Sequence, residues 1–300
     1  MPLLRALLIS ILLSAPWVQT AAAQGPFGPQ GAEGEPNRAQ AWLVPSPDPE
    51  APSHAVLFRP PGDGPFRLAV IAHASTQNVL YRAQMPQPEY RALASVLVAR
   101  GFAVLVPERP GHGATGGLYL EDQRGCDDAD YAHSGRVTAD EIAAAMTYLR
   151  QQSFIRRDGT VIIGHSAGGW GALALALAGA DPADISNIVV FAPGRGGQPN
   201  GIPDQICAPH TLIAAAGEFG RAARVPVSWL VAANDSYFPP DFSRKMADAF
   251  SAGGDKVDFR ALGAYDGEGH WMAETDNGVK FATSELDRAL KIPPTARAKK

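Results

Sequence analysis

The stretch that decides the fold is Val161-Ile162-Ile163-Gly164-His165-Ser166-Ala167-Gly168-Gly169, near the middle of the 300-residue chain. Its β-branched apolar run ends in Gly-x-Ser-x-Gly, and residues 170–178 continue as a run rich in alanine and leucine. This order predicts a buried strand, a tight turn and a helix, with Ser166 in the turn. Such a turn presents the serine hydroxyl at the strand end, where the helix N-terminus favours an anion. Ser166 is therefore the candidate nucleophile; the alternative is a glycine-rich turn whose serine only caps the helix.

Short apolar strands alternate with helices through most of the chain, which predicts an α/β fold with a largely parallel sheet covered on both faces. The expected strands besides the one before Gly164 are 41–44, 55–59, 67–72, 102–106, 188–191, 227–232 and 257–262. The expected helices besides the one after Ser166 are 89–100, 138–151, 240–252 and 278–289. For the helix over 138–151 we predict Thr138 as the N-cap, with Glu141 completing a capping box.

A serine hydroxyl needs a base within hydrogen-bonding reach, and that base needs a carboxylate to orient it. His270 lies in a Gly-rich loop after the last expected strand, and Asp235 comes directly after the strand over 227–232. The chain order Ser, Asp, His predicts these two as partners of Ser166. The competing residues are His54, His112, His165 and His210 for the base, and Asp241, Asp258 and Asp266 for the acid.

An oxyanion that forms on Ser166 would need two backbone donors. One is the amide of Ala167, and the other should come from the turn after the strand over 67–72, where Ser75 is the expected donor. His73, His165 and Arg195 are candidate substrate contacts, because each lies at or directly beyond the carboxyl end of an expected strand. The alternatives are that His165 packs beside the sheet and that Arg195 is a solvated loop side chain.

With these residues in this order, the chain resembles the α/β-hydrolase superfamily over residues 54–290, most closely its dienelactone-hydrolase-like and esterase-like members. The pair His73-Ala74 stands where many members have His-Gly, and residues 107–113 are similar to the family's Asp-x-x-Gly-x-Gly loop. The resemblance implies a roughly eight-stranded, mostly parallel sheet and acyl transfer through an acyl-enzyme, without a cofactor. Two departures are Ala74 in place of glycine and Ser166 where dienelactone hydrolases use cysteine.

The ends of the chain predict export. Residues 1–23 combine a positive n-region at Arg5, an apolar run over 6–15 and the small residues Ala21-Ala22-Ala23, which is typical of a signal peptide; the alternative is a membrane anchor. We expect residues 24–40 to be a flexible lead-in, 41–290 a single domain with a small flap near 194–222, and 291–300 a disordered tail.

The two cysteines, Cys126 and Cys207, are expected to form a disulfide in an exported chain, with two separate thiols as the alternative. Neither has the spacing of a metal site. The net charge of −4 argues against nucleic acid and against stable association with an anionic membrane after removal of the signal.

These patterns predict an exported serine hydrolase that cleaves a small-molecule carboxylic ester with Ser166, Asp235 and His270. A peptidase or amidase with the same three residues is the first alternative, although peptidases of this fold usually carry a larger cap. A non-catalytic binding module is the second. The acyl and alcohol specificity and the oligomeric state are left open.

Overall fold

The computed structural model describes residues 26–178, 184–254 and 257–292. The expected signal peptide over 1–23 and all but residues 291 and 292 of the expected tail lie outside the described residues. No helix in the described ranges has the length and apolar character needed to cross a bilayer.

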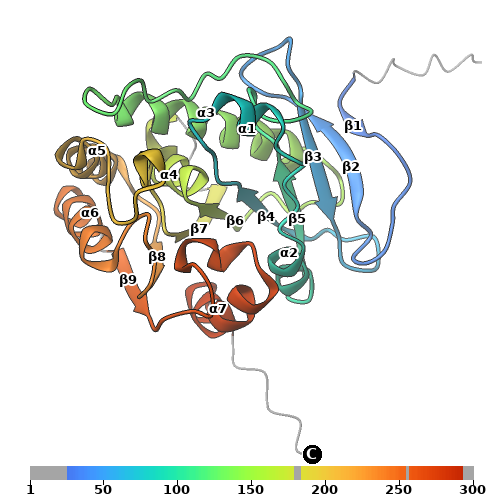
Figure 1. Cartoon of the computed structure of the whole chain (residues 1–300). Helices are drawn as coiled ribbons and strands as arrows, with labels where there is room; N and C mark the ends of the chain where they lie inside the picture. The colour runs from blue at the N-terminus through green and yellow to red at the C-terminus, as the bar shows by residue number, and fades with distance from the viewer. Residues whose placement is uncertain (1–25, 179–183, 255–256, 293–300) are drawn as a thin grey trace, which may run out of the picture.

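The core of the fold is one nine-stranded sheet with the strand order β1-β2-β3-β5-β4-β6-β7-β8-β9 (Figure 1). The first three strands are antiparallel to their neighbours, and every pair from β5 to β9 is parallel. Their bounds are β1 Gly28–Pro29, β2 Gln40–Val44, β3 Ser53–Phe58, β4 Arg67–Ala72, β5 Phe102–Pro107, β6 Thr160–His165, β7 Ile185–Phe191, β8 Val227–Ala232 and β9 Val257–Leu262. The predicted mostly parallel sheet is confirmed, with nine strands in place of roughly eight.

Helices cover both faces of the sheet, because the central strands are apolar on both sides (Figure 1). One buried cluster joins the sheet to α3, α4, α5 and α6, and the other joins it to α2 and α7. The helix bounds are α1 Val79–Ala83, α2 Arg91–Val98, α3 Tyr131–Arg150, α4 Ala167–Ala174, α5 Pro209–Ala222, α6 Pro240–Gly253 and α7 Asp276–Ala289.

The predicted start of the helix over 138–151 was wrong. Helix α3 begins at Tyr131, and Asp130 is its N-cap, with a side-chain oxygen 3.0 Å from the amide nitrogen of His133. Thr138 and Glu141 therefore lie in the interior of the helix, where both are buried. The capping-box pattern was misleading because these two polar residues pair with buried groups from other segments, as described below.

The stretch expected to be a flexible lead-in has a defined path from residue 26 onward. Strand β1 pairs with β2, Phe27 packs edge-on against Tyr148 with ring centroids 5.8 Å apart, and Arg38 pairs with Glu33 at 2.6 Å. The expected flap near 194–222 also divides in two. Its second half is helix α5, which packs against α6, so only the loop before it can border a site.

Candidate active site

The turn between β6 and α4 holds Ser166 in an unusual backbone conformation, with φ of 52° and ψ of −118°. A positive φ at a residue other than glycine costs about 1–3 kcal/mol and persists only where its surroundings impose it. The surroundings here leave no room for side chains: a Cβ on Gly168 would lie 2.2 Å from the carbonyl oxygen of Ala72, and one on Gly164 would lie 2.5 Å from Cα of Gly169. The glycines of the motif therefore permit the close packing of strand and helix that strains Ser166.

The structure brings the three predicted residues together. Ser166 Oγ lies 2.9 Å from Nε2 of His270, and Nδ1 of the same ring lies 3.3 Å from Oδ2 of Asp235. Asp235 follows β8, and its other oxygen accepts the backbone N–H groups of Tyr237 at 2.9 Å and Phe238 at 2.8 Å. Serine and carboxylate therefore contact opposite nitrogens of one imidazole.

The environment of His270 favours a neutral ring. Burial lowers the pKa of His270 from its ordinary value, although the hydrogen bond and the charge of Asp235 act to raise it. The ring of Tyr237 stacks on the imidazole, with centroids 4.2 Å apart. A neutral imidazole with Nδ1–H held by a carboxylate has its Nε2 lone pair free to accept a proton from Ser166.

The two predicted oxyanion donors border the same cleft as Ser166. Ser75 and Ala167 both line it, whereas the amide of Ala74 donates to the hydroxyl oxygen of Tyr90 at 3.0 Å. Within the described residues, no hydrogen bond engages the amide of Ser75 or of Ala167. These two N–H groups are thus available to a ligand that enters the cleft.

The cleft has a volume of about 810 Å³ and is walled by loops at the carboxyl ends of the parallel strands. These loops come from the β4–α1 connection, the segment before α3, the segment after β7 and the two segments that carry Asp235 and His270. The lining residues are Ser75, Thr76, Gln77, Asn78, Tyr81, Gln123, Arg124, Cys126, Ser166, Ala167, Gly194, Arg195, Gly196, Gly197, Gln198, Pro199, Asn200, Gly201, Cys207, Tyr237, Phe238, His270 and Trp271.

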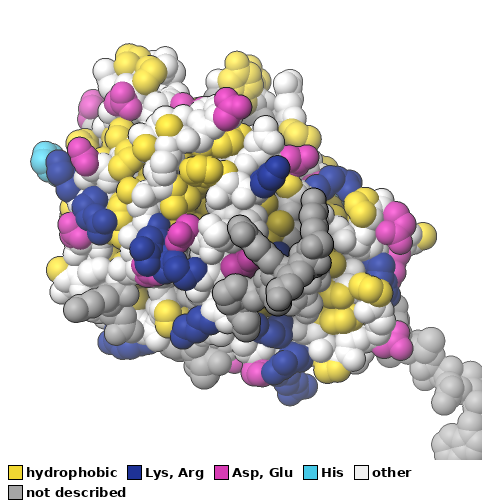
Figure 2. All heavy atoms as spheres, turned by 90° about the horizontal axis from the view of Figure 1, so that it is seen from below, with side chains coloured by type: hydrophobic (Ala, Val, Ile, Leu, Met, Phe, Trp, Pro, Cys, Tyr) yellow, Lys and Arg dark blue, Asp and Glu magenta, His cyan; other side chains and the backbone are white. Residues whose placement is uncertain are grey.

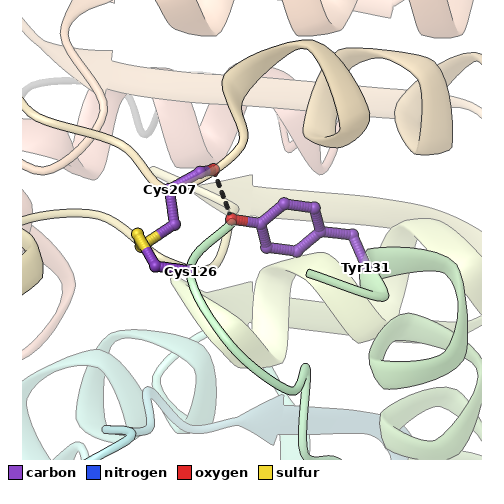
Figure 3. The surroundings of a disulfide bond; sticks show 3 residues. All are labelled: Cys126, Tyr131 and Cys207. Atoms are coloured by element: carbon purple, nitrogen blue, oxygen red, sulfur yellow. Dashed lines mark hydrogen bonds between the residues drawn. A yellow bond between two sulfur atoms is a disulfide. The ribbon is translucent and has the colours of Figure 1, made fainter. Parts of the chain in front are cut away.

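The disulfide expected between Cys126 and Cys207 is present (Figure 3), and both cysteines line the cleft. It joins the segment before α3 to the loop before α5, which are 81 residues apart in sequence. The Tyr131 hydroxyl donates to the carbonyl oxygen of Cys207 at 2.5 Å, so the first turn of α3 supports the same loop. The bridge and this hydrogen bond give the loop wall a fixed position relative to α3.

His73 and His165 do not reach the cleft, which corrects the prediction that they contact substrate. His73 is buried; its Nε2 accepts the backbone N–H of Arg109 at 3.1 Å, and its Nδ1 lies 2.5 Å from the carbonyl oxygen of Ala74. His73 therefore ties the turn that contains Ser75 to the loop after β5.

His165 is likewise buried, and its two ring nitrogens are both occupied. Its Nε2–H donates to the carbonyl oxygen of His270 at 2.7 Å, and its Nδ1 lies 3.0 Å from the hydroxyl of Tyr90 and 3.1 Å from Oε1 of Glu274. His165 therefore supports the backbone of His270, in agreement with the alternative that His165 packs beside the sheet.

Arg195 lines the cleft, but its charged group is already paired. Its guanidinium binds Glu121 and donates to the hydroxyl of Tyr119 at 2.9 Å, and its side chain is almost completely buried. The predicted role as a clamp for substrate would require this pair to break. Neither the clamp nor the solvated alternative describes its position.

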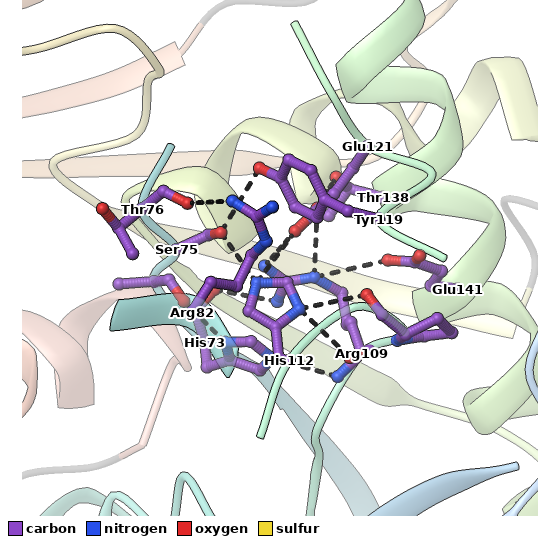
Figure 4. A network of polar contacts seen from close by, with 12 residues as sticks. His73, Ser75, Thr76, Arg82, Arg109, His112, Tyr119, Glu121, Thr138 and Glu141 are labelled. Atoms are coloured by element: carbon purple, nitrogen blue, oxygen red, sulfur yellow. Dashed lines mark hydrogen bonds and ion pairs between the residues drawn. The ribbon is translucent and has the colours of Figure 1, made fainter. Parts of the chain in front are cut away.

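The sequence did not predict a buried charge network that lies behind Ser75 (Figure 4). Glu121 lies at its centre and contacts Arg109 at 3.2 Å, Arg195, Thr138 and His112 at 3.3 Å. Burial acts to raise the pKa of Glu121, but the two arginines hold it below its ordinary value. The carboxylate is therefore charged, and two cations from separate loops neutralise it.

The remaining members of the network, Glu141 and Ser75, lie at its edge. Glu141 lies 3.4 Å from Arg109, and burial together with the charge of Glu121 raises its pKa well above the ordinary value. Ser75 Oγ lies 2.7 Å from Nε2 of His112, so the network reaches the candidate oxyanion turn. No local motif could have announced it, because its members come from the loop after β5, helix α3 and the loop after β7.

Among the described residues, no group of three or more His, Cys, Asp or Glu side chains is placed to hold a metal ion.

A family model described as the alpha/beta hydrolase family matches residues 69–296. Among solved structures, an esterase from an Arctic intertidal metagenomic library, described as novel and cold-adapted, is 16% identical, with a TM-score of 0.58 over 87% of this chain and 99% of that chain. A candidate dienelactone hydrolase from Klebsiella pneumoniae subsp. pneumoniae MGH 78578 is also 16% identical, with a TM-score of 0.54 over 84% and 98% of the two chains.

A puromycin-hydrolyzing peptidase from Mycobacterium tuberculosis is 18% identical, with a TM-score of 0.57. The match covers 87% of this chain but 41% of that chain. At these identities the structural matches show a shared fold. No curated protein matches the chain.

Proposed function

The chain belongs to the alpha/beta hydrolase family, and we propose that it is a serine hydrolase that cleaves carboxylic esters. The observation that carries this proposal is the alignment of Ser166, His270 and Asp235, hereafter the proposed triad, with serine and carboxylate on opposite imidazole nitrogens. This alignment is the one that lets an imidazole remove the serine proton while the carboxylate stabilises the resulting cation.

In the first half of the reaction, Ser166 Oγ attacks the ester carbonyl as its proton passes to Nε2 of His270. The negative charge moves to the former carbonyl oxygen, where the amides of Ser75 and Ala167 can donate to it. Collapse of the tetrahedral intermediate breaks the bond to the alcohol oxygen, which takes the proton from His270. The acyl group then remains on Ser166.

The second half repeats the proton transfers with water. His270 removes a proton from a water molecule while the water oxygen attacks the acyl carbonyl. The ring returns that proton to Ser166 Oγ when the carboxylic acid leaves. Asp235 keeps Nδ1 of His270 protonated throughout. Two backbone N–H groups that donate to Asp235 fix the orientation of its carboxylate for this role.

An ester is favoured over a peptide by what surrounds the cleft. The loop between β7 and α5 is short and tied by the disulfide, and the similar peptidase has most of its length outside the matched region. We also propose that the protein is exported, which the sequence of residues 1–23 and the disulfide support, because disulfides persist in oxidising compartments.

The test is the hydrolysis of short p-nitrophenyl esters and of the matched p-nitroanilides by wild type, Ser166→Ala and Ser75→Ala. We expect ester cleavage by wild type, a loss of about 10⁴-fold or more in kcat/KM for Ser166→Ala, and a loss of less than about tenfold for Ser75→Ala, which keeps its backbone amide. A fluorophosphonate probe should label wild type and Ser75→Ala but not Ser166→Ala.

Full activity of Ser166→Ala would overturn the proposed nucleophile. Cleavage of the anilides without cleavage of the esters would replace the esterase by an amidase. Absence of both activities and of labelling would leave a binding module of this fold.

A further inference from the structure

Helix α1, Val79–Ala83, has the reverse of the usual polarity of a surface helix. Its large apolar residues Val79, Leu80 and Tyr81 are 63%, 66% and 71% exposed, whereas Arg82 is only 7% exposed. Surface helices normally bury the apolar side and expose the charged one. An isolated exposed leucine needs no explanation, but three consecutive apolar side chains beside a buried arginine do.

Contacts on the inner side of α1 impose this orientation. The Arg82 guanidinium lies over the ring of Tyr119, 3.5 Å from its centroid, and donates to the carbonyl oxygen of Thr76 at 2.9 Å. The Asn78 side chain caps the helix by accepting the amides of Leu80 and Tyr81 at 3.0 and 3.1 Å, and Gly113 N–H donates to the Arg82 carbonyl at 3.0 Å. If the helix turned its apolar side inward, Arg82 would lose its contacts with Tyr119 and the Thr76 carbonyl.

The exposed side chains stand at the mouth of the candidate active site. Helix α1 begins four residues after Ser75, and Tyr81 itself lines the cleft. Of the six large apolar side chains that the described residues expose, three are on α1 and a fourth is Leu118, 69% exposed and next in the chain to Tyr119. We call Val79, Leu80, Tyr81 and Leu118 the rim patch.

The two segments that carry the rim patch are almost free of charged residues. Residues 74–88 contain one charged side chain, the buried Arg82, and residues 110–120 contain no Asp, Glu, Lys or Arg. The face seen from below in Figure 2, by contrast, carries many Lys, Arg, Asp and Glu side chains among its apolar ones. These two segments therefore have few charged groups to desolvate when they meet an apolar surface.

We propose that the rim patch docks the protein on the surface of a water-insoluble ester, an aggregate of acyl chains, and so brings the cleft to its substrate. This inference rests on the proposed function and adds the physical form of the substrate. Four exposed side chains supply on the order of a few hundred Å² of apolar surface, less than the ~1,000 Å² that a specific protein interface buries. Adsorption to an apolar phase needs no shape complementarity. Each apolar side chain that leaves water for that phase makes the free energy of adsorption more favourable.

The first experiment measures docking without hydrolysis. Ser166→Ala protein is mixed with tributyrin droplets, and the fraction that floats with them is compared with that of the triple variant Ser166→Ala/Val79→Thr/Leu80→Gln. Neither Val79 nor Leu80 lines the cleft, and both replacements keep side chains of similar size. We expect a loss of about tenfold in the partition onto droplets, and no loss for the control Ser166→Ala/Phe281→Gln, which removes an exposed apolar side chain of α7.

The second experiment measures turnover with Ser166 intact. Val79→Thr/Leu80→Gln should hydrolyse tributyrin emulsion about tenfold more slowly, while kcat/KM for dissolved p-nitrophenyl acetate changes by less than about twofold. Equal droplet binding by the variants, or a parallel loss on both substrates, would overturn the inference. It would also be overturned if wild type is a dimer in solution that this variant converts to monomers, because a second copy would then cover the rim patch.

The two proposals fail in different ways. Droplet binding by Ser166→Ala protein with no turnover of any ester by wild type would overturn the proposed function alone. Ester turnover with no droplet binding would overturn the docking surface alone.

Discussion

Two serine–histidine–carboxylate groups border the same cleft, and they differ in which ring nitrogens they use. In the proposed triad, the serine contacts Nε2 and the carboxylate contacts Nδ1 of His270. In the second group, Ser75 Oγ at 2.7 Å and Glu121 Oε1 at 3.3 Å both lie near Nε2 of His112 (Figure 4). Only in the first arrangement can the ring take the serine proton on Nε2 while its Nδ1–H stays held by the carboxylate.

The other nitrogen of His112 shows how this ring is held. Its Nδ1 lies 3.1 Å from the carbonyl oxygens of Arg109 and Pro110, so Nδ1 carries the hydrogen and Nε2 accepts from the Ser75 hydroxyl. Burial lowers the pKa of His112 to about 4, so the ring is neutral near pH 7. His112 therefore anchors Ser75 as part of a turn and does not activate it.

The carboxylates differ as well. Glu121 is paired with the two guanidinium groups of Arg109 and Arg195, whereas the described contacts of Asp235 are two backbone amides and His270. A carboxylate that two arginines neutralise stabilises a nearby imidazolium only weakly. One that is held by neutral amides keeps its full effect on the ring beside it.

Replacement of each carboxylate by its amide should separate the two groups most strongly. Asp235→Asn should lower kcat by about 10⁴-fold, because the amide favours the wrong tautomer of His270, and should leave the fold intact. Glu121→Gln should instead destabilise the fold by about 3–5 kcal/mol, because two buried guanidinium groups lose their counter-charge. Urea unfolding and steady-state kinetics on a p-nitrophenyl ester measure the two effects.

The comparison fails if the effects are exchanged. A stable Glu121→Gln protein with a 10⁴-fold loss of kcat would place Glu121 in the reaction, and a fully active Asp235→Asn would remove Asp235 from it. Glu218→Gln is a suitable control for stability, because its pair with Arg136 is exposed and exposed pairs contribute about 0–1 kcal/mol.

The pH dependence should report one histidine and not the other. Because burial lowers the pKa of His270, kcat/KM should be level near neutral pH and fall as the pH drops through a midpoint below 6.5, the ordinary value, where the ring becomes protonated. A His112→Gln variant should show the same midpoint in rates measured from pH 4.5 to 8. A midpoint above 6.5, or one that moves when His112 is replaced, would contradict this assignment.

The smallest expected effect is that of replacing His112, which anchors Ser75. His112→Gln should lower kcat by about three- to tenfold with little change in KM, because the turn that holds the Ser75 amide becomes less ordered. Combining it with Ser75→Ala should add almost no further loss, since both changes remove the same hydrogen bond. Additive losses in the double variant would show that His112 acts through another route.

Local patterns allowed much of this structure to be predicted. The elbow around Ser166, the strands β2 to β9 and the positions of Asp235 after β8 and His270 in the segment after β9 follow from short-range hydrophobic periodicity and turn residues. The start of α3 was mispredicted because Thr138 and Glu141 imitate a capping box. In the structure Thr138 donates to Glu121 and Glu141 pairs with Arg109, and both partners lie in the loop between β5 and α3.

The sequence by itself determined the strand–turn–helix element at Ser166 and the order of the sheet elements, because backbone sterics and apolar periodicity act over a few residues. Only the tertiary structure decided which ring nitrogens of His270 and His112 their serine and carboxylate partners contact, and why Arg82 is buried beside exposed apolar side chains. These outcomes depend on side chains from separate loops that meet in a buried space. Burial and pairing there fix protonation and orientation, and neither is encoded in the neighbours along the chain.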